Sequence, residues 1–426
     1  MLDAVQAIGV GLLLGFGPLA LGATEEWSIF FIEEGVVLLF LIWALRGFIG
    51  GGVEFAVRPL LVPMVLFAAL VGAQLLLHRT AYWYATWQKA LLWTAYGALF
   101  FLTAQRFRSG VWLRRLGVAL TTFGFLLAMF AILQKFAGNG KIYWVLTNQA
   151  AAEFFGPYAN HSHYAGLMEM LIAFPLVLAM MADTAPAMRV LYSFAALIMG
   201  SSIFLSKSRG GVIAFIIELA VLTMVFAQGQ QRATRLRLWA GLALLLIACV
   251  LLVRPHGLWD RFAEVSNRAD KARDENRLTM LEDSLRLVRA RPLLGWGFGT
   301  FSAVYPQYRS FYTELMVNAA HDDFLEVTVE TGLVGLGLAV AFIYLLYRNG
   351  LRAARNWRRD PRAGMALAAL VGCTGLLVHS FSDFNLQVPA NAALFFALCA
   401  VATAGSAPEE WPRPRIKTAA EIAVRA

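Results

Sequence analysis

Runs of about 20 apolar residues recur along the whole chain, and this feature restricts the fold more than any other. A helix of about 20 residues crosses a hydrocarbon core of about 30 Å. The 426 residues are 59% hydrophobic and only 15% charged, whereas soluble domains carry about 25% charged residues. The runs are too long and too unpatterned for barrel strands. The sequence therefore predicts an all-α, polytopic membrane protein.

Twelve such runs divide the chain into four parts. We expect nine transmembrane helices in residues 1–253, a large loop in 254–320, three more helices in 321–405 and a tail in 406–426. A cleavable signal peptide is not expected, because no basic region precedes the first run. The predicted runs are 4–22, 27–45, 59–78, 86–104, 112–134, 162–182, 189–206, 211–228, 236–253, 322–347, 363–382 and 387–405.

The distribution of basic residues predicts the topology. They cluster in RGFIGGGVEFAVR, QRFRSGVWLRR, QRATRLR, RNGLRAARNWRRDPR and RPRIK. These segments lie on the same side of the membrane if successive runs cross it in opposite directions. By the positive-inside rule that side is the cytoplasm, so both termini are expected there. The net charge of +9 is then a topology signal, and we expect no nucleic acid partner. The loop between the ninth and tenth helices lies on the outer side, since long loops cross regardless of charge.

The outer loop contains the run NRLTMLEDSLRLVRARPLLGWGFGTF, which predicts a helix followed by a glycine-interrupted turn. Its apolar positions recur at the spacing of one helical face, namely Leu278, Leu281, Leu285 and Val288. Arg277 falls about 40° from Leu281 on a helical wheel. This arginine either frays into water or points into the mouth of a site.

A histidine and two aspartates precede the tenth apolar run in NAAHDDFLEVTVETGLVG. We expect Asn318 to cap the helix and His321 to lie in its first turn. Asp322 and Asp323 favour the positive end of the helix dipole. Histidine is the side chain most often used as a general base, so His321 is a candidate catalytic residue. The alternative is a capping or solvated histidine at the membrane surface.

The connection between the seventh and eighth runs, SKSRGG, is short and basic. Lys207 and Arg209 lie on the outer side, where the positive-inside rule disfavours them. Serine, glycine and a bidentate guanidinium together suit an anion such as phosphate. The alternative is an ordinary polar turn. It is not a nucleotide-binding loop, because the pattern GxxxxGK[ST] is missing.

Two more stretches carry polar residues at the outer boundary. FFGPYANHSHYAGLMEM and HSFSDFNLQVPANA flank the start of the sixth and the end of the eleventh runs. Histidines two apart at a helix start diverge and suit a metal poorly, so contacts to a polar substrate or hydrogen bonds between helices are expected. No metal, cofactor or disulfide is predicted, because Cys249, Cys373 and Cys399 read as buried apolar residues. The candidate substrate contacts are Asn160, His161, His163, Tyr164, Asp322, His379 and Asp383.

Together these motifs resemble the membrane-embedded O-antigen ligase and polymerase superfamily. The resemblance rests on FFGPYANHSHYAG, SKSRGG, the loop run, AHDDFLEVTVETGLVG and HSFSDFNLQVPANA, which occur in the family's order. Two positions depart from its pattern. Asp322 follows His321 where many relatives have asparagine, and Lys207 replaces a residue that is commonly apolar.

The resemblance implies a metal-independent glycosyl transfer at the periplasmic face of the bacterial cytoplasmic (inner) membrane. The donor would be a glycan on undecaprenyl diphosphate, and the acceptor a hydroxyl of a glycan, of lipid A core or of a protein. It implies that Arg209 and Arg277, with Lys207, hold the diphosphate and that His321 is the general base. It also implies inversion at the anomeric carbon.

Two alternatives remain at this point. A protein O-oligosaccharyltransferase would share the donor and the base, so the sequence does not separate it from a polysaccharide ligase or polymerase. A transporter for polar solutes also explains twelve apolar runs with scattered polar residues. Transporters tend to have related halves with broken helices in corresponding positions, and this sequence shows no such repeat.

Overall fold

The computed structural model describes residues 2–49, 58–147, 153–253, 268–312 and 317–404. This part of the chain is helical and forms no β-strand, only two isolated bridges. The predicted tail, 406–426, and the start of the outer loop lie outside it.

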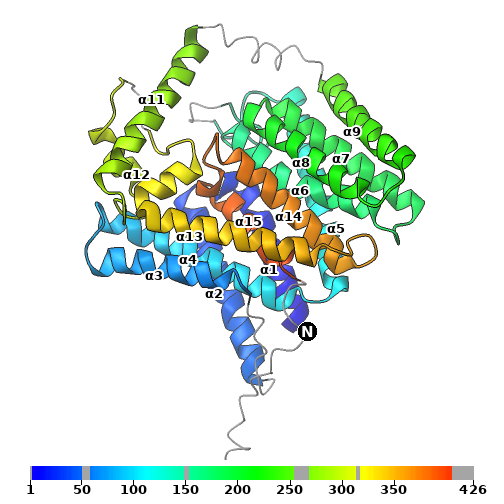
Figure 1. The fold of residues 1–426 in the computed structure, drawn as a ribbon, viewed down its shortest axis with the longest axis horizontal. Coiled ribbons are helices and arrows are strands. Elements are labelled where there is room, and N and C mark those ends of the chain that lie inside the picture. Colours follow the sequence, from blue (N-terminus) through cyan, green and yellow to red (C-terminus); the bar gives the residue numbers. More distant parts are fainter. Residues whose placement is uncertain (1, 50–57, 148–152, 254–267, 313–316, 405–426) are drawn as a thin grey trace, which may run out of the picture.

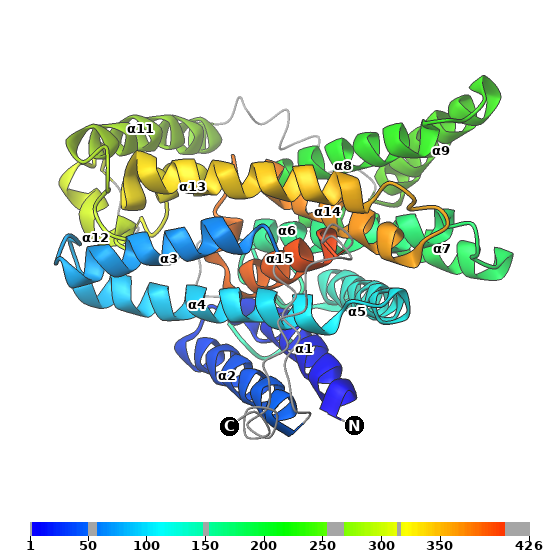
Figure 2. The same ribbon diagram turned by 60° about the horizontal axis from the view of Figure 1, so that its bottom comes forward.

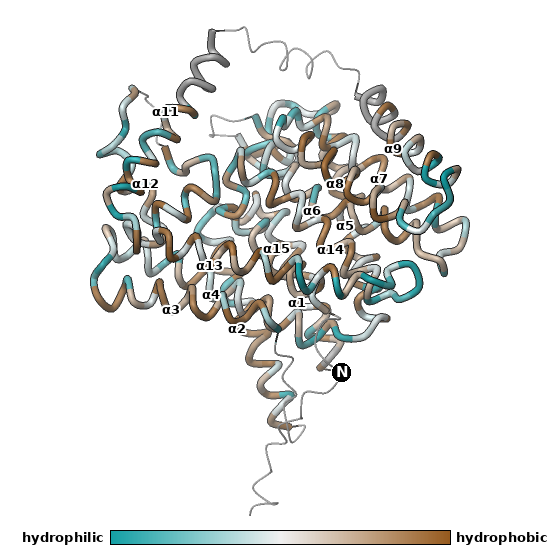
Figure 3. Tube along the Cα trace, viewed as in Figure 1, coloured by the Kyte–Doolittle hydropathy of each residue, from teal (hydrophilic) through white to brown (hydrophobic). Residues whose placement is uncertain are grey.

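Each of the twelve predicted apolar runs coincides with a helix. The helices are α1 (Leu2–Leu19), α2 (Glu26–Ile49), α3 (Leu61–Leu76), α4 (Trp83–Arg106), α5 (Gly110–Ala137), α6 (His161–Met180), α7 (Pro186–Ser206), α8 (Arg209–Ala227), α9 (Arg232–Val253), α13 (Asp323–Ala353), α14 (Pro361–His379) and α15 (Pro389–Ala402). Among the described residues, seven of these are long and apolar enough to cross a membrane, namely α2, α5, α6, α7, α8, α13 and α14. The chain is therefore a multi-pass helical protein, and twelve spans remain a prediction. Hydrophobic residues predominate along the helices, and hydrophilic ones gather at the connections (Figure 3).

The helices pack as layers around α6, α14 and α15 (Figure 1). Of the most apolar stretch of α6, 89% is buried, against 22% for the peripheral α2. On one side α13, α3 and α4 run alongside one another, and α1 and α2 lie beyond α4 (Figure 2). The central helices are thus shielded by protein, while the outer ones expose apolar side chains at the surface.

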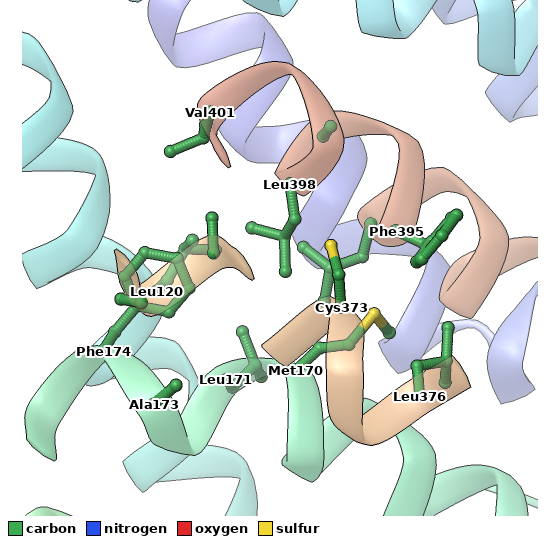
Figure 4. Close-up of a cluster of buried hydrophobic side chains, with 14 of the residues drawn as sticks. Leu120, Met170, Leu171, Ala173, Phe174, Cys373, Leu376, Phe395, Leu398 and Val401 are labelled. Carbon is green, nitrogen blue, oxygen red and sulfur yellow. The ribbon is translucent and has the colours of Figure 1, made fainter. Parts of the chain in front are cut away.

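Close packing of α6 against α14 builds the core drawn in Figure 4. Met170, Leu171 and Phe174 of α6 face Cys373 and Leu376 of α14 there. Between apolar helices in lipid, dispersion and close backbone approach replace the hydrophobic effect as the main attraction. At Gly372 of α14 a Cβ atom would lie 2.5 Å from the Met170 carbonyl oxygen. A side chain larger than hydrogen would therefore separate the two helices.

The outer loop holds α11 (Arg268–Ala290), α12 (Phe301–Val304) and the 3₁₀ turn η3 (Tyr305–Gln307). The predicted helix is present, but the predicted apolar face is wrong. The exposed positions include Leu278, Leu281 and Leu285, and the buried ones are Met280, Asp283, Ser284 and Leu287. Helical spacing identifies residues that share a face, but it does not show whether that face packs on protein or is exposed. The face of α11 that packs on the protein includes Asp283, whose carboxylate accepts hydrogen bonds from Tyr305 and Ser310.

Helix α13 is broken at Gly332, which has φ 67° and ψ −168°. The loop that follows α11 packs into the break, where a Cβ on Gly332 would lie 2.2 Å from the Leu293 carbonyl oxygen. The Trp296 N–H donates to the Val329 carbonyl at 3.0 Å and caps the first half of the helix. The first half of α13, which begins beside His321, is therefore fixed by the outer loop.

Candidate functional site

Four helix termini meet at one end of the bundle, which we call the site end. They are the starts of α6, α8 and α13 and the end of α14. The Ser208 hydroxyl donates to Ser162 at 3.1 Å and ties α8 to α6. The Asp323 N–H donates to the Ser380 carbonyl at 3.0 Å and ties α13 to α14. Residues that lie far apart in the sequence are thereby brought together.

His321 and Asp383 form the most open pair at the site end. The Nδ1 atom of His321 lies 3.4 Å from Oδ1 of Asp383, and the histidine side chain is 34% exposed while the carboxylate is 6% exposed. The distance exceeds that of a normal N–H···O hydrogen bond, so the contact is loose. A carboxylate at Nδ1 selects the tautomer that leaves Nε2 able to accept a proton.

A second histidine shares the same carboxylate. Nε2 of His163 lies 3.9 Å from Oδ1 of Asp383. The Phe384 ring makes an edge contact with each imidazole, with its centroid 4.7 Å from that of His163 and 4.9 Å from that of His321. Burial alone would raise the pKa of Asp383. The contact with His321 and the electrostatic influence of the nearby His163 and His379 outweigh burial and lower that pKa below its ordinary value. Asp383 is therefore ionised.

The start of α13 differs from the prediction. Asp322 rather than Asn318 caps the helix, and its Oδ1 accepts from Phe324 N at 2.9 Å and Leu325 N at 3.0 Å. His321 precedes the cap with φ 54° instead of lying in the first turn. An acceptor directly before the first helical residue reaches its N–H groups better than one further upstream. Left-handed backbone at a residue other than glycine is strained and often occurs at functional sites.

His379 forms a second, fully buried histidine–carboxylate pair. Its Nδ1 lies 2.9 Å from Oε1 of Glu169, and the two side chains are 1% and 0% exposed. The other edge of the imidazole faces the start of α8, where a Cβ on Gly210 would lie 2.9 Å from the His379 Nε2. Glu169 was missed in the sequence analysis. Its signal was a single carboxylate inside an apolar run, which usually marks an inward-facing functional or structural group.

The SKSRGG connection joins α7 to α8 at the site end. Lys207 ends α7 with φ 62°, another left-handed residue. Ser208 caps α8 and accepts from Gly211 N at 3.1 Å. Arg209 is half-buried as the first residue of α8, where the helix dipole adds positive potential. The predicted phosphate-binding arginine therefore lies beside the His379 pair.

Arg277 is not joined to this cluster. Its side chain is exposed on α11, and within the described part of the chain no hydrogen bond or ion pair links it to His321, Asp383 or Arg209. It lies on the same side of α11 as the exposed Leu281. The structure brings His163, His321 and His379 together around Asp383, whereas Arg277 lies apart from them.

The remaining predicted contacts stabilise the start of α6 and the cap of α13. Asn160 caps α6 and accepts from Ser162 N at 2.9 Å. Tyr164 is fully buried and donates its hydroxyl proton to Ser202 at 2.9 Å. His161 is half-buried, and its N–H donates to the Glu153 carbonyl at 2.9 Å.

Asp322 is half-buried beside His321. Burial raises the pKa of Asp322, although the N–H groups of Leu325 and Phe324 oppose the shift. Because the carboxylate already caps α13, its role in holding the helix start is visible in the structure. A contact with substrate stays a prediction for Asp322, as it does for Asn160, His161 and Tyr164.

Comparison with known proteins agrees with the motifs. Residues 194–340 match the family model described as O-antigen ligase, and this segment runs from α7 into α13. It contains Lys207, Arg209, Arg277 and His321, whereas Asp383 lies beyond it. None of the curated proteins matches the chain. The match confirms the predicted resemblance and supports a lipid-linked glycan ligase or polymerase in general.

Proposed function

We propose that this chain, which carries the O-antigen ligase match over residues 194–340, transfers a glycan from undecaprenyl diphosphate to an acceptor hydroxyl. The observation that carries the proposal is the contact of His321 with Asp383 at the helix termini where Arg209 begins α8. A base, a carboxylate that orients it and a fixed cation are the groups that this reaction needs. The site end would face the periplasm of the inner membrane, as the positive-inside rule predicts.

The donor brings a diphosphate leaving group, and the chain would balance its charge with guanidinium groups. Arg209 offers a bidentate contact to phosphate oxygens, and the positive end of α8 adds to it. Lys207 is adjacent, and Arg277 would join from α11 when the donor binds. Fixed positive groups stabilise the charge that develops on the departing diphosphate, without proton transfer to it.

The acceptor hydroxyl would be activated by His321. Its oxygen attacks the anomeric carbon while the carbon–oxygen bond to the diphosphate breaks, and the hydroxyl proton passes to Nε2 of His321. Attack opposite to the leaving group gives inversion. Asp383 holds Nδ1 and stabilises the imidazolium that forms, as a carboxylate does for other histidine bases. A placed base of this kind contributes about 10² to 10⁴ in rate.

The buried pair of His379 and Glu169 would position Arg209 without touching substrate. The imidazole packs directly on Gly210, the residue after Arg209. Because both members are almost fully buried, the pair fixes where α8 begins. The guanidinium is then presented from a rigid helix start and not from a loose turn.

The test is transfer by the purified protein in lipid bilayers. With a lipid-linked oligosaccharide as donor, a lengthened glycan on the carrier indicates a polymerase, glycan on lipid A core a ligase, and glycan on a serine or threonine a protein glycosyltransferase. His321→Ala is expected to abolish transfer while the protein still folds and inserts into the membrane. No transfer to any acceptor, or transfer by His321→Ala at the wild-type rate, would refute the proposal.

A further inference from the structure

A groove of about 540 Å³ opens at the end of the bundle opposite the site end. It is lined by the first turns of α5 and by the start of α14, specifically Gly110, Val111, Arg114, Arg115, Val118, Ala119 and Pro361. Its volume is within the range of small-molecule and cofactor pockets, about 300 to 1,000 Å³. The groove lies at the start of α5, so it combines a helix long and apolar enough to cross a membrane with an arginine-rich boundary.

The charge in this groove is positive. Arg114 forms an ion pair with Asp183 and is neutralised. Arg115 is exposed, and its guanidinium lies 5.0 Å from the centre of the Trp112 ring. Within the described part of the chain Arg115 forms no ion pair with a carboxylate. The groove therefore presents one guanidinium whose charge the protein does not balance.

An apolar track leads from this guanidinium along α5. The residues that α5 exposes continue from Val111 and Ala119 in the groove to Leu126 and Leu133 further along the helix. Their spacing follows one face of a helix, and α5 is one of the helices long enough to cross the membrane. A ligand that fits both parts carries an anionic head and hydrocarbon chains.

We propose that this groove binds an anionic phospholipid of the leaflet at that end. Its phosphate contacts Arg115, and its acyl chains lie along the exposed face of α5. Basic pockets beside transmembrane helices recognise such headgroups through the same combination of charge and apolar wall. The proposal does not depend on the glycosyl transfer, because the groove is at the other end of the bundle.

Native mass spectrometry tests the proposal on the full-length protein in neutral detergent. Phosphatidylglycerol and phosphatidylcholine with identical acyl chains are added in equal amounts, and the bound lipids are counted. We expect the wild type to retain phosphatidylglycerol preferentially and Arg115→Gln to lose about fivefold in that preference, since each arginine at a lipid surface contributes about this factor. Arg352→Gln, an exposed arginine on α13, is the matched control and should keep the preference. Equal binding of both lipids to the wild type, or an equal loss in both variants, would overturn the proposal.

A second variant tests whether lipid binding requires the shape of the groove as well as its positive charge. Ala119→Phe keeps every arginine and fills the groove from an exposed position on α5, so the protein should fold normally. We expect it to lose the phosphatidylglycerol preference as Arg115→Gln does. Full retention of the preference in Ala119→Phe would show that surface charge alone attracts the lipid, and the site would be rejected.

Discussion

Replacing Asp383 by asparagine is the sharpest single perturbation of the proposed base. The substitution preserves size and leaves an oxygen to accept the Phe384 N–H, which now donates to Oδ1 at 2.9 Å. It removes only the negative charge that lies 3.4 Å from Nδ1 of His321. Any loss of activity therefore reports on that charge and not on packing.

The expected magnitude follows from the distance. Two unit charges 3.4 Å apart interact by about 5 kcal/mol at an effective dielectric constant of about 20, and by about 1 kcal/mol in water. Because the His321 side chain is 34% exposed, solvent screening reduces the larger value, and we expect about 2 to 3 kcal/mol. At about 1.4 kcal/mol per tenfold change in rate, the transfer step slows about 100-fold.

The assay is single-turnover transfer from a lipid-linked donor in bilayers, which isolates the chemical step from product release. Asp360→Asn is the matched control, because Asp360 caps the other end of α14 and accepts from Arg362 N. This variant should transfer at the wild-type rate. Wild-type transfer by a folded Asp383→Asn protein, or an equal loss in Asp360→Asn, would refute the role of the carboxylate.

The melting temperature of the same variant, measured over a series of pH values, tests independently whether Asp383 is ionised in the folded protein. The lowered pKa of Asp383 means that its ionised form stabilises the fold above the ordinary carboxyl pKa of about 3.9. This contribution disappears as the pH falls through the folded-state value. The melting temperature of Asp383→Asn should lie below the wild type near pH 7, and the gap should begin to narrow as the pH falls below about 4. A gap that does not change with pH would contradict this reading.

Three further predictions concern the other parts of the site. Arg209→Lys should lower transfer about 10- to 100-fold, because an ammonium cannot reproduce the bidentate contact; a rise in donor KM with unchanged kcat would show that only binding was lost. Gly210→Ala should lower stability by about 1 to 3 kcal/mol, because its Cβ would lie 2.5 Å from Ser382 Oγ; Gly72→Ala, whose Cβ meets no atom within 4 Å, is the control in the same denaturation experiment. Chelation of divalent ions should leave transfer unchanged if the reaction is metal-independent, and activity that chelation removes and Mg²⁺ restores would contradict that mechanism.

The helices themselves follow directly from the sequence. In a membrane every backbone polar group must be satisfied within the segment, so an apolar run of sufficient length has few alternatives to a helix. All twelve runs are accordingly helical. Which face of each helix packs on the protein is harder to predict, because a face toward lipid and a face toward the protein interior are both apolar. On α11 the leucines at 278 and 285 face outward, and Asp283 faces inward.

The site could be predicted only in part, for physical reasons. His321, Asp383 and Arg209 were recognisable because ionisable residues are costly at a membrane boundary. The contact of His163 with Asp383 depends on how α6 packs on α14, and helical spacing does not specify that packing. Glu169 was hidden in the middle of an apolar run, and the break at Gly332 depends on the loop that packs into it.

We propose that Arg209, Arg277 and His321 act on one donor molecule. A cryo-electron microscopy structure of the protein in a bilayer with a lipid diphosphate donor tests this arrangement. We expect density for the diphosphate within hydrogen-bond distance of the Arg209 and Arg277 guanidinium groups, with the anomeric carbon beside Nε2 of His321. Donor density at another place on the protein, or a diphosphate beyond hydrogen-bond distance of Arg277, would refute this arrangement.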